Sequence, residues 1–329
     1  MTTSPPTLTD MPDLVLSKIF EEVGFPGILK LQKVCRSLRE FLQNFPPDPK
    51  RLSIHLTLYR SHEIKVKFEP EDQPIFEVCY FGNNRNCTIK TQNREKILDK
   101  SDSTKVLFQD LKIILDSQKS EIQNFKVKNR IRRSSYSVFL EKLDQFMANY
   151  TPKLKVQNFH MNFYEIDQVT SILRNFDSKK LEEISLFPSL GTPLNFQSLV
   201  KMDQWKNSKR VRIHDGTVVG DKVEDFLHFS EILVKFESVS TKDLVLMAEK
   251  FLNSPIPRDY RITYNCFEDK GELLNLSGPA HCFTDLVQYG KKLFKPVPNS
   301  SDAVFISQSI KARSFNFSRI PLEDVSKNY

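Results

Sequence analysis

Residues 156–187 read VQNFHMNFYEIDQVTSILRNFDSKKLEEISLF, and they predict a strand, a helix and a second strand. Short apolar runs suited to strands occupy 156–161 and 181–187. Between them, four apolar residues follow the i, i+3, i+4, i+7 spacing that places side chains on one face of a helix. They are Val169, Ile172, Leu173 and Phe176.

The same helix-then-strand unit recurs on both sides of this stretch. Helical stripes with the same spacing lie at 143–150 and 244–251. About five such units in succession favour parallel strands in a curved sheet that is backed by helices. The further elements predicted here are strands at 209–213, 233–239 and 260–266 and a helix around 196–202.

Three of the strands share one spacing of apolar residues: apolar, two residues, apolar, one residue, apolar. They are Ile122/Phe125/Val127, Val156/Phe159/Met161 and Leu181/Ile184/Leu186. Their starts fall 34 and 25 residues apart, near the roughly 20–29-residue unit of leucine-rich repeats. Although Phe, Val and Met replace leucine, the repetition predicts an α/β, leucine-rich-repeat-like domain with a curved, largely parallel sheet.

Composition excludes several classes of enzyme. The chain has 329 residues, 39% hydrophobic and 27% charged, which suits two folded domains. It has only 9 glycines and contains neither G-x-G-x-x-G nor G-x-x-x-x-G-K-[ST], so glycine-rich phosphate loops are excluded. H-E-x-x-H and G-x-S-x-G are also absent.

No cofactor or metal is expected. The cysteines and histidines are scattered without a C-x-x-C motif, whereas closed zinc sites need four ligands at tight spacing. His160 and His214 fall on predicted strands and are expected on the sheet surface, and Trp205 is expected to be structural. Five cysteines, no apolar run of membrane-spanning length and a polar N-terminus predict reduced thiols and a cytoplasmic or nuclear protein.

The net charge of +7 is concentrated in two segments. Residues 117–135 carry six Lys or Arg against one Glu, and residues 200–212 carry five against one Asp. An anionic partner would therefore meet the middle of the chain. A solvated surface explains such runs at least as well, since the first segment has few interleaved aromatic residues.

The N-terminal part is predicted to be a small helical unit with surplus apolar surface. Gly24 is expected to stop a first helix and Pro26 to start a second, while a third helix precedes Pro46. Leu14, Val15 and Leu16 are contiguous, so apolar side chains point to more than one side of the first helix. Such surface is what a partner-binding module needs.

The remaining segments are predicted more briefly. Strands are expected at 55–59, 64–68, 75–81 and 88–90, with a hairpin loop at 82–86 and a helix at 103–117. Near the C-terminus, a helix is expected at 284–294 and a strand at 310–317.

The N-terminal helical unit resembles an F-box. The strings that carry the resemblance are Met11-Pro12-Asp-Leu14-Val-Leu16-Ser-Lys-Ile19-Phe20 and Ile28-Leu-Lys-Leu31-Gln-Lys-Val34-Cys35-Arg36-Ser-Leu38. Two positions depart from the usual pattern: Met11 replaces leucine before the proline, and Leu38 stands where many members have tryptophan. Both changes keep the position apolar.

The second half resembles the FTH domain of the nematode F-box A family. The strings are Phe176-Asp-Ser-Lys-Lys-Leu-Glu-Glu-Ile-Ser185, Gln204-Trp-Lys-Asn-Ser-Lys209, His228-Phe-Ser230 and Phe236-Glu-Ser-Val-Ser-Thr-Lys-Asp-Leu244. The predicted organisation is a loose N-terminus at 1–10, a three-helix F-box at 11–46, a β-rich connection with a helix at 47–120, an FTH or leucine-rich-repeat-like domain at 121–282, and a C-terminal cap and tail at 283–329.

The resemblance implies a non-enzymatic adaptor of an SCF-type (cullin–RING) ubiquitin ligase. The F-box would bind a Skp-type adaptor and, through it, a cullin, while the C-terminal domain would hold an unidentified protein substrate. No catalytic residue, cofactor or membrane contact is implied. The residues that would include the adaptor contacts are Met11, Pro12, Leu14, Leu16, Ile19, Phe20, Ile28, Leu31, Val34, Cys35 and Leu38.

Two alternatives stay open. One is a protein-binding module that uses its F-box outside a ligase. The other, which the residues favour less, is a nucleic-acid-binding protein acting through 117–135 and 200–212, with Arg130, Arg132 and Arg133 as contacts.

Overall fold

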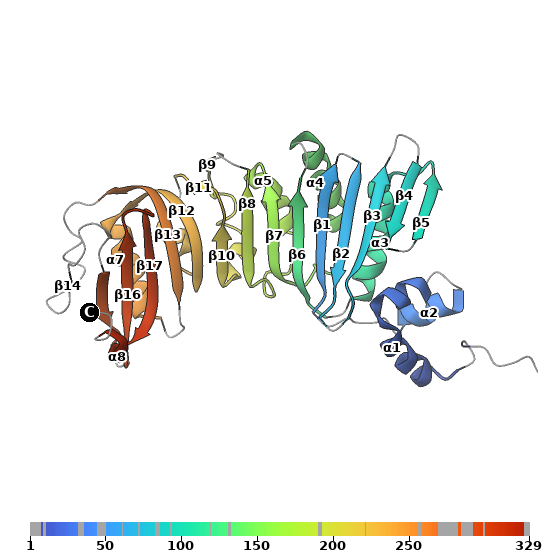
Figure 1. The fold of residues 1–329 in the computed structure, drawn as a ribbon, viewed down its shortest axis with the longest axis horizontal. Helices are drawn as coiled ribbons and strands as arrows, with labels where there is room; N and C mark the ends of the chain where they lie inside the picture. The colour runs from blue at the N-terminus through green and yellow to red at the C-terminus, as the bar shows by residue number, and fades with distance from the viewer. Residues whose placement is uncertain are drawn as a thin grey trace, which may run out of the picture. The chain divides into compact units, whose positions relative to one another are not determined.

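The computed structural model describes most of the chain and shows a mixed α/β protein (Figure 1). It separates into two compact units, Met1–Asn158 and Phe159–Tyr329. No described helix is long and apolar enough to cross a membrane. The described residues are 8, 11–31, 36–44, 51–60, 62–71, 73–82, 86–92, 94–118, 120–130, 133–189, 193–220, 222–254, 258–268, 282–283, 292–298 and 300–325.

The described N-terminal residues form two helices, α1 (Asp13–Leu31) and α2 (Arg36–Asn44). The predicted break at Gly24 is absent, because α1 continues through Gly24 and Pro26. Side chains before and after the proline pack on one apolar cluster, and this shared packing outweighs the single hydrogen bond that Pro26 cannot donate. The predicted second helix is therefore the last part of α1.

Six neighbouring strands of the sheet lie in the first unit, in the order β5–β4–β3–β2–β1–β6, and we call them the first sheet. The first five strands are antiparallel, and β6 is parallel to β1. The predicted strands are present and β3 pairs antiparallel with β4, while residues 83–85 of the predicted hairpin loop lie outside the described residues. Strand β5 was not predicted. The strands are β1 (Ser53–Arg60), β2 (Glu63–Glu69), β3 (Phe76–Gly82), β4 (Asn86–Thr91), β5 (Arg94–Asp99) and β6 (Ile122–Asn129).

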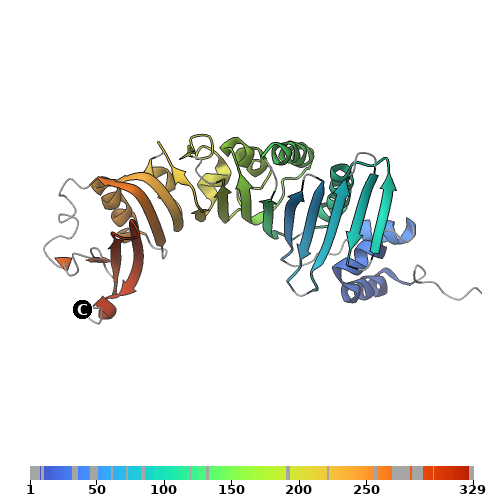
Figure 2. The ribbon, with the colours of Figure 1, turned by 45° about the horizontal axis from the view of Figure 1, so that its top comes forward.

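Two helices lie on one side of this sheet, α3 (Ser103–Ser117) and α4 (Arg133–Ala148), as Figures 1 and 2 show. Asp102 caps α3 by accepting hydrogen bonds from the backbone N–H groups of Thr104 and Lys105. Alternate strand residues such as Val66 and Val127 are buried, whereas their neighbours are polar and partly or fully exposed. The sheet therefore has one apolar face and one polar face.

The second unit begins its sheet with neighbouring parallel strands. These are β8 (Glu183–Pro188), β10 (Arg210–Ile213), β12 (Glu231–Ser240) and β13 (Asp259–Glu268), in that order. The short strands β9 (Pro193–Leu194) and β11 (Thr217–Val218) continue the parallel pairing beside β12. The predicted parallel arrangement thus holds for this part, and β7 (Val156–Phe163) runs across the boundary between the units.

The C-terminal strands are antiparallel. They follow β13 in the order β17 (Ser314–Pro321), β16 (Asp302–Ser309), β15 (Lys292–Pro296) and β14 (Cys282–Phe283), and α8 (Leu322–Val325) ends the described chain. The helix predicted at 284–294 is wrong for its last three residues, which belong to β15. Pairing with β16 supplies hydrogen bonds that override a weak helical pattern. Residues 284–291 lie outside the described residues.

Helices α5 (Ile166–Leu173), α6 (Asp203–Asn207) and α7 (Thr241–Leu252) connect strands of the second unit, with the 3-10 turn η2 (Val223–Phe226). The helix expected around 196–202 is a series of turns, and the helix itself follows at α6. Trp205 is fully buried there, among Phe196, Phe226 and Phe229. Its indole N–H donates to the carbonyl of Asp225 at 3.1 Å, so its position is that of a core residue.

Candidate functional site

A small apolar cluster joins α1 to α2. Leu16, Phe20, Leu38 and Leu42 are each at most 4% exposed, and Ile19 packs against them. The cluster also includes the partly buried Leu8, Leu31 and Phe41. The rings of Phe20 and Phe41 meet edge to face, with centroids 5.4 Å apart. These residues hold the two helices together.

Other apolar side chains of the same region face solvent. Leu14 is 71% exposed, Val15 is 42% exposed and Met11 is 41% exposed, while Val23 is exposed to a similar degree. The contiguous apolar triplet at 14–16 is thus divided: Leu16 packs inward and its two predecessors point outward. This surplus surface is suited to a partner that covers it.

The predicted adaptor contacts therefore fall into three groups by exposure. Met11, Pro12 and Leu14 are exposed, Ile19 and Leu31 are partly buried, and Leu16, Phe20 and Leu38 are buried. The side chain of Ile28, and both Val34 and Cys35, lie outside the described residues. Sequence could not separate these groups, because the position of α2 decides which face of α1 is covered.

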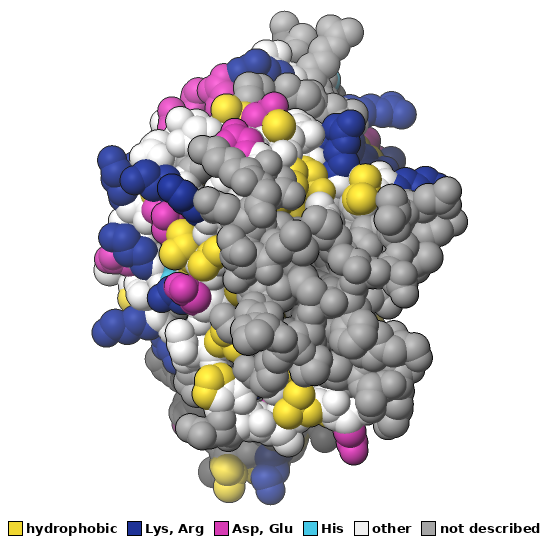
Figure 3. All heavy atoms as spheres, turned by 90° about the vertical axis from the view of Figure 1, so that its left-hand side faces the viewer, with side chains coloured by type: hydrophobic (Ala, Val, Ile, Leu, Met, Phe, Trp, Pro, Cys, Tyr) yellow, Lys and Arg dark blue, Asp and Glu magenta, His cyan; other side chains and the backbone are white. Residues whose placement is uncertain are grey.

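Three of the five cations of the basic segment 200–212 pair with carboxylates that sequence reasoning missed. Lys209 pairs with Glu182 at 2.9 Å, and Arg210 pairs with Glu183 at 3.0 Å. Arg212 reaches Glu231 at 3.1 Å on the other neighbouring strand. Basic and acidic side chains also lie interspersed on the described part of the surface in Figure 3. This segment offers no concentrated positive field to an anionic partner.

The basic segment 117–135 is arranged differently. Lys126 and Lys128 alternate along β6 with the buried Phe125 and Val127, so both lysines lie on the polar face of the first sheet. Arg130 follows directly, and its guanidinium lies 5.2 Å from the centre of the Tyr59 ring. Arg132 lies outside the described residues, and Arg133 begins α4. Lys126, Lys128 and Arg130 follow an i, i+2, i+4 spacing. This spacing could have predicted from the sequence that the three cations lie on one face of the strand.

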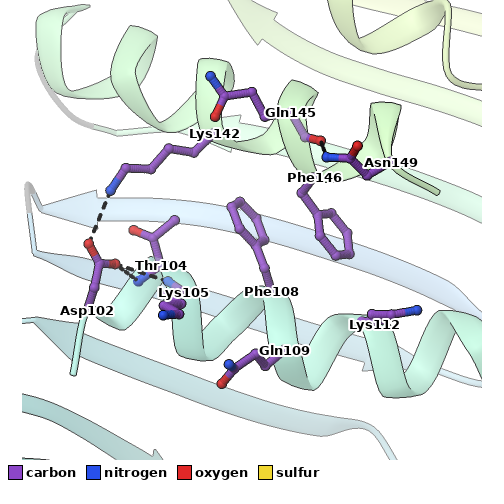
Figure 4. A pocket seen from close by; sticks show the side chains of 10 residues that line it. All are labelled: Asp102, Thr104, Lys105, Phe108, Gln109, Lys112, Lys142, Gln145, Phe146 and Asn149. Atoms are coloured by element: carbon purple, nitrogen blue, oxygen red, sulfur yellow. Dashed lines mark hydrogen bonds and ion pairs between the residues drawn. The ribbon is translucent and has the colours of Figure 1, made fainter.

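A shallow hollow of about 480 Å³ lies between α3 and α4 (Figure 4). The rings of Phe108 and Phe146 stack there with centroids 4.9 Å apart and an interplanar angle of 7°. Lys142 closes one end by pairing with Asp102 at 3.2 Å. Two charged residues that line the hollow, Lys142 and Asp102, thus already pair with each other. We therefore interpret the hollow as a consequence of the packing of α3 against α4 and not as a ligand site.

The described residues contain no group of three or more His, Cys, Asp or Glu that could hold a metal ion. The His214 ring stacks on Phe187 with centroids 4.3 Å apart, directly after β10. His228 Nε2 lies 2.9 Å from the carbonyl of Trp205, and burial lowers the pKa of His228. Both imidazoles pack against neighbouring aromatic rings, so we interpret them as structural residues.

Exposed apolar side chains on a small helical unit, joined to a larger α/β domain, are the organisation of a protein-interaction module. Comparison with family models makes this specific: an F-box domain matches residues 8–50, and an FTH domain matches residues 137–273. The chain therefore combines an N-terminal F-box with a C-terminal FTH domain. Comparisons with curated proteins and with solved structures give no match.

An F-box implies a role in substrate recognition by SCF-type ubiquitin ligases, and F-box domains typically bind a Skp-type adaptor. The FTH domain indicates a second module for protein interaction. Both domains are adaptor or interaction domains without catalytic activity of their own.

Proposed function

We propose that this chain is the substrate receptor of an SCF-type ubiquitin ligase. The F-box binds a Skp-type adaptor and, through it, a cullin, while the FTH domain binds a protein substrate. The observation that carries the proposal is the F-box match at 8–50 together with the exposed apolar side chains on α1.

The exposed group supplies the adaptor contact. Met11, Pro12, Leu14 and Val15 lie at the start of α1, where a covering partner would remove their apolar surface from water. Leu16, Phe20 and Leu38 contribute indirectly, because they hold α2 against α1. Ile19 and Leu31 lie between the two groups, so a charge at either position disturbs helix packing as well as binding.

The mechanism is proximity. The ligation chemistry takes place on other subunits, and this chain raises the effective concentration of substrate lysines near the charged conjugating enzyme. The FTH domain supplies a rigid surface for this purpose, since β8, β10, β12 and β13 form a continuous parallel sheet. We assign it to the leucine-rich-repeat-like class on the recurring helix-then-strand units, with the substrate held on the sheet.

Assembly with purified partners tests the proposal. The full-length chain is mixed with a Skp-type adaptor and a cullin, and the mixture is separated by size-exclusion chromatography. We expect all three proteins to elute together. Binding of the adaptor without the cullin would favour an F-box acting outside a ligase, and binding of neither would overturn the proposal.

Nucleic-acid binding is the weaker candidate. The cations of 200–212 at Lys209, Arg210 and Arg212 are paired with carboxylates. Tyr59, which lies beside the other basic segment, has cations over its ring and offers bases little to stack on.

A further inference from the structure

The polar face of the first sheet carries a row of cations along its β6 side. Lys126 lies opposite His55 and Lys128 opposite Thr57 in the parallel register of β1 and β6. Arg130 continues the row beyond the end of β6, held by its backbone N–H, which donates to the carbonyl of Leu58 at 2.9 Å. We call Lys126, Lys128 and Arg130, with His55 beside them, the cationic strip.

Two carboxylates of the first sheet, Glu77 and Glu69, pair with lysines of β2. Glu77 pairs with Lys65 at 2.5 Å, and Glu69 pairs with Lys67. Both of those lysines belong to β2, on the far side of β1 from β6. Lys126 is partly buried and lies close enough to Glu69 to interact with its charge, whereas Lys128 and Arg130 are exposed.

His55 lies within reach of both the lysines and the Glu69 carboxylate of this face. Its side chain is only 12% exposed, and Nε2 lies 3.3 Å from Glu69 Oε2 without the geometry of a hydrogen bond. Burial is the largest cause that lowers the pKa of His55 to about 4, and Lys126, Lys128 and Lys67 lower it further against the opposing effect of Glu69. The imidazole is neutral at pH 7, so one polar group of the strip is a hydrogen-bonding group without charge.

We infer that the cationic strip binds an extended acidic peptide segment of the substrate, with carboxylates at alternate positions. Alternate residues of a strand lie about 6.6 Å apart on one face, and an extended peptide repeats with the same spacing. Glu or Asp at positions i, i+2 and i+4 of such a segment therefore meets Lys126, Lys128 and Arg130 in register. The inference rests on the proposed function as a substrate receptor.

The strip lies outside both family matches, which cover 8–50 and 137–273. It would give the β-rich region between the two domains a role as an additional substrate contact. A peptide fits better than single-stranded nucleic acid, because bases need stacking platforms. The Tyr59 ring on this face already has Lys65 5.5 Å and Arg130 5.2 Å from its centre.

Fluorescence anisotropy with labelled synthetic peptides tests the inference on the full-length chain. The probe is Glu-Ser-Glu-Ser-Glu-Ser-Glu, and a peptide of equal charge with its four Glu in one block is the comparison. We expect the alternating peptide to bind about threefold more tightly, because only alternate side chains of an extended chain face the strip. Binding should weaken as salt rises from about 50 to 300 mM.

Charge reversal locates the site. Lys128→Glu and Arg130→Glu should each weaken binding of the alternating peptide about fivefold, as expected for exposed ion pairs. Lys96→Glu, which makes the same change at an exposed position of β5, should leave it within about twofold.

Three results would overturn the inference: no binding at about 1 mM peptide, equal losses in all three variants, or tighter binding of a heptauridine RNA with the same dependence on Lys128 and Arg130. Adaptor binding, measured on the same samples, separates failure of the strip from failure of the proposed function.

Discussion

Replacing His55 by glutamine should make the first unit less sensitive to acid. The pKa of His55 is lowered from 6.5 to about 4 in the folded chain, mainly by burial. Above pH 6.5 the imidazole is neutral in both folded and unfolded states and contributes nothing to the pH dependence. Below pH 6.5 the unfolded state takes up the proton first, so stability falls until the pH reaches about 4.

The magnitude follows from the two pKa values. At pH 5 a histidine with a pKa of 6.5 is mostly protonated, whereas one with a pKa of about 4 is mostly neutral. The difference lowers the free energy of unfolding by about 2 kcal/mol between pH 7.5 and pH 5. His55→Gln has no proton to take up, so acidification should cost this variant about 2 kcal/mol less than the wild-type chain.

Urea unfolding followed by circular dichroism at pH 7.5 and pH 5 measures this difference. Hydrogen exchange in β1 and β6 assigns it to the first unit, and His62→Gln, at an exposed position nearby, is the control. Burial also lowers the pKa values of His214 and His228. Both residues are present in every variant, so their contribution to acid sensitivity cancels in the comparison. Equal acid sensitivity of His55→Gln and wild type, within about 0.5 kcal/mol, would refute the reasoning.

Two further predictions concern the second unit. Trp205→Ala should destabilise it by about 3–5 kcal/mol, because the change empties a fully buried site and removes the indole N–H that donates to the Asp225 carbonyl. Urea unfolding measures the loss, and retained adaptor binding would show that the F-box is unaffected. Ser240→Ala should lower the free energy of unfolding by about 1 kcal/mol, since Ser240 Oγ accepts from the Asp243 N–H in the capping box of α7. Thermal unfolding should show a smaller loss of stability for Ser240→Gly. Equal losses in the two variants would argue against the cap.

Strongly periodic segments could be predicted from sequence. The apolar stripes at 169–176 and 244–251 lie on α5 and α7 and the residues just after α5, and the alternating runs lie on strands. These patterns are local, so a single sequence carries them in full. The break predicted at Gly24 failed because packing on both sides of Pro26 is a tertiary effect.

Strand β5 shows a second limit. Its sequence, REKILD, is mostly charged and exposed, and only pairing with β4 makes it a strand. Strand β15 was missed for a similar reason, since its pairing with β16 comes from residues that follow it in the chain. Hydrogen bonds between paired strands leave no periodic signal in the sequence.

The sequence predicted which part of the chain holds the candidate site, but not which side chains form its surface. Motifs placed the F-box, but only the position of α2 separates the buried Leu16 from the exposed Leu14. Likewise, sequence showed an excess of charge at 200–212, but not that Glu183 and Glu231, on neighbouring strands, pair with Arg210 and Arg212. In both cases the missing information is which side chains meet across separate elements.

The affinity of the full-length chain for a purified Skp-type adaptor, measured by titration calorimetry with Leu14→Asp beside it, tests the central claim most directly. Leu14 is 71% exposed, so aspartate there leaves the cluster of α1 and α2 intact. Ile113→Asp, at an α3 position that is 42% exposed, is the matched control. Wild type and Ile113→Asp should bind equally, and Leu14→Asp should bind at least about tenfold more weakly. Equal binding by all three, or no binding by the wild-type chain, would contradict the account.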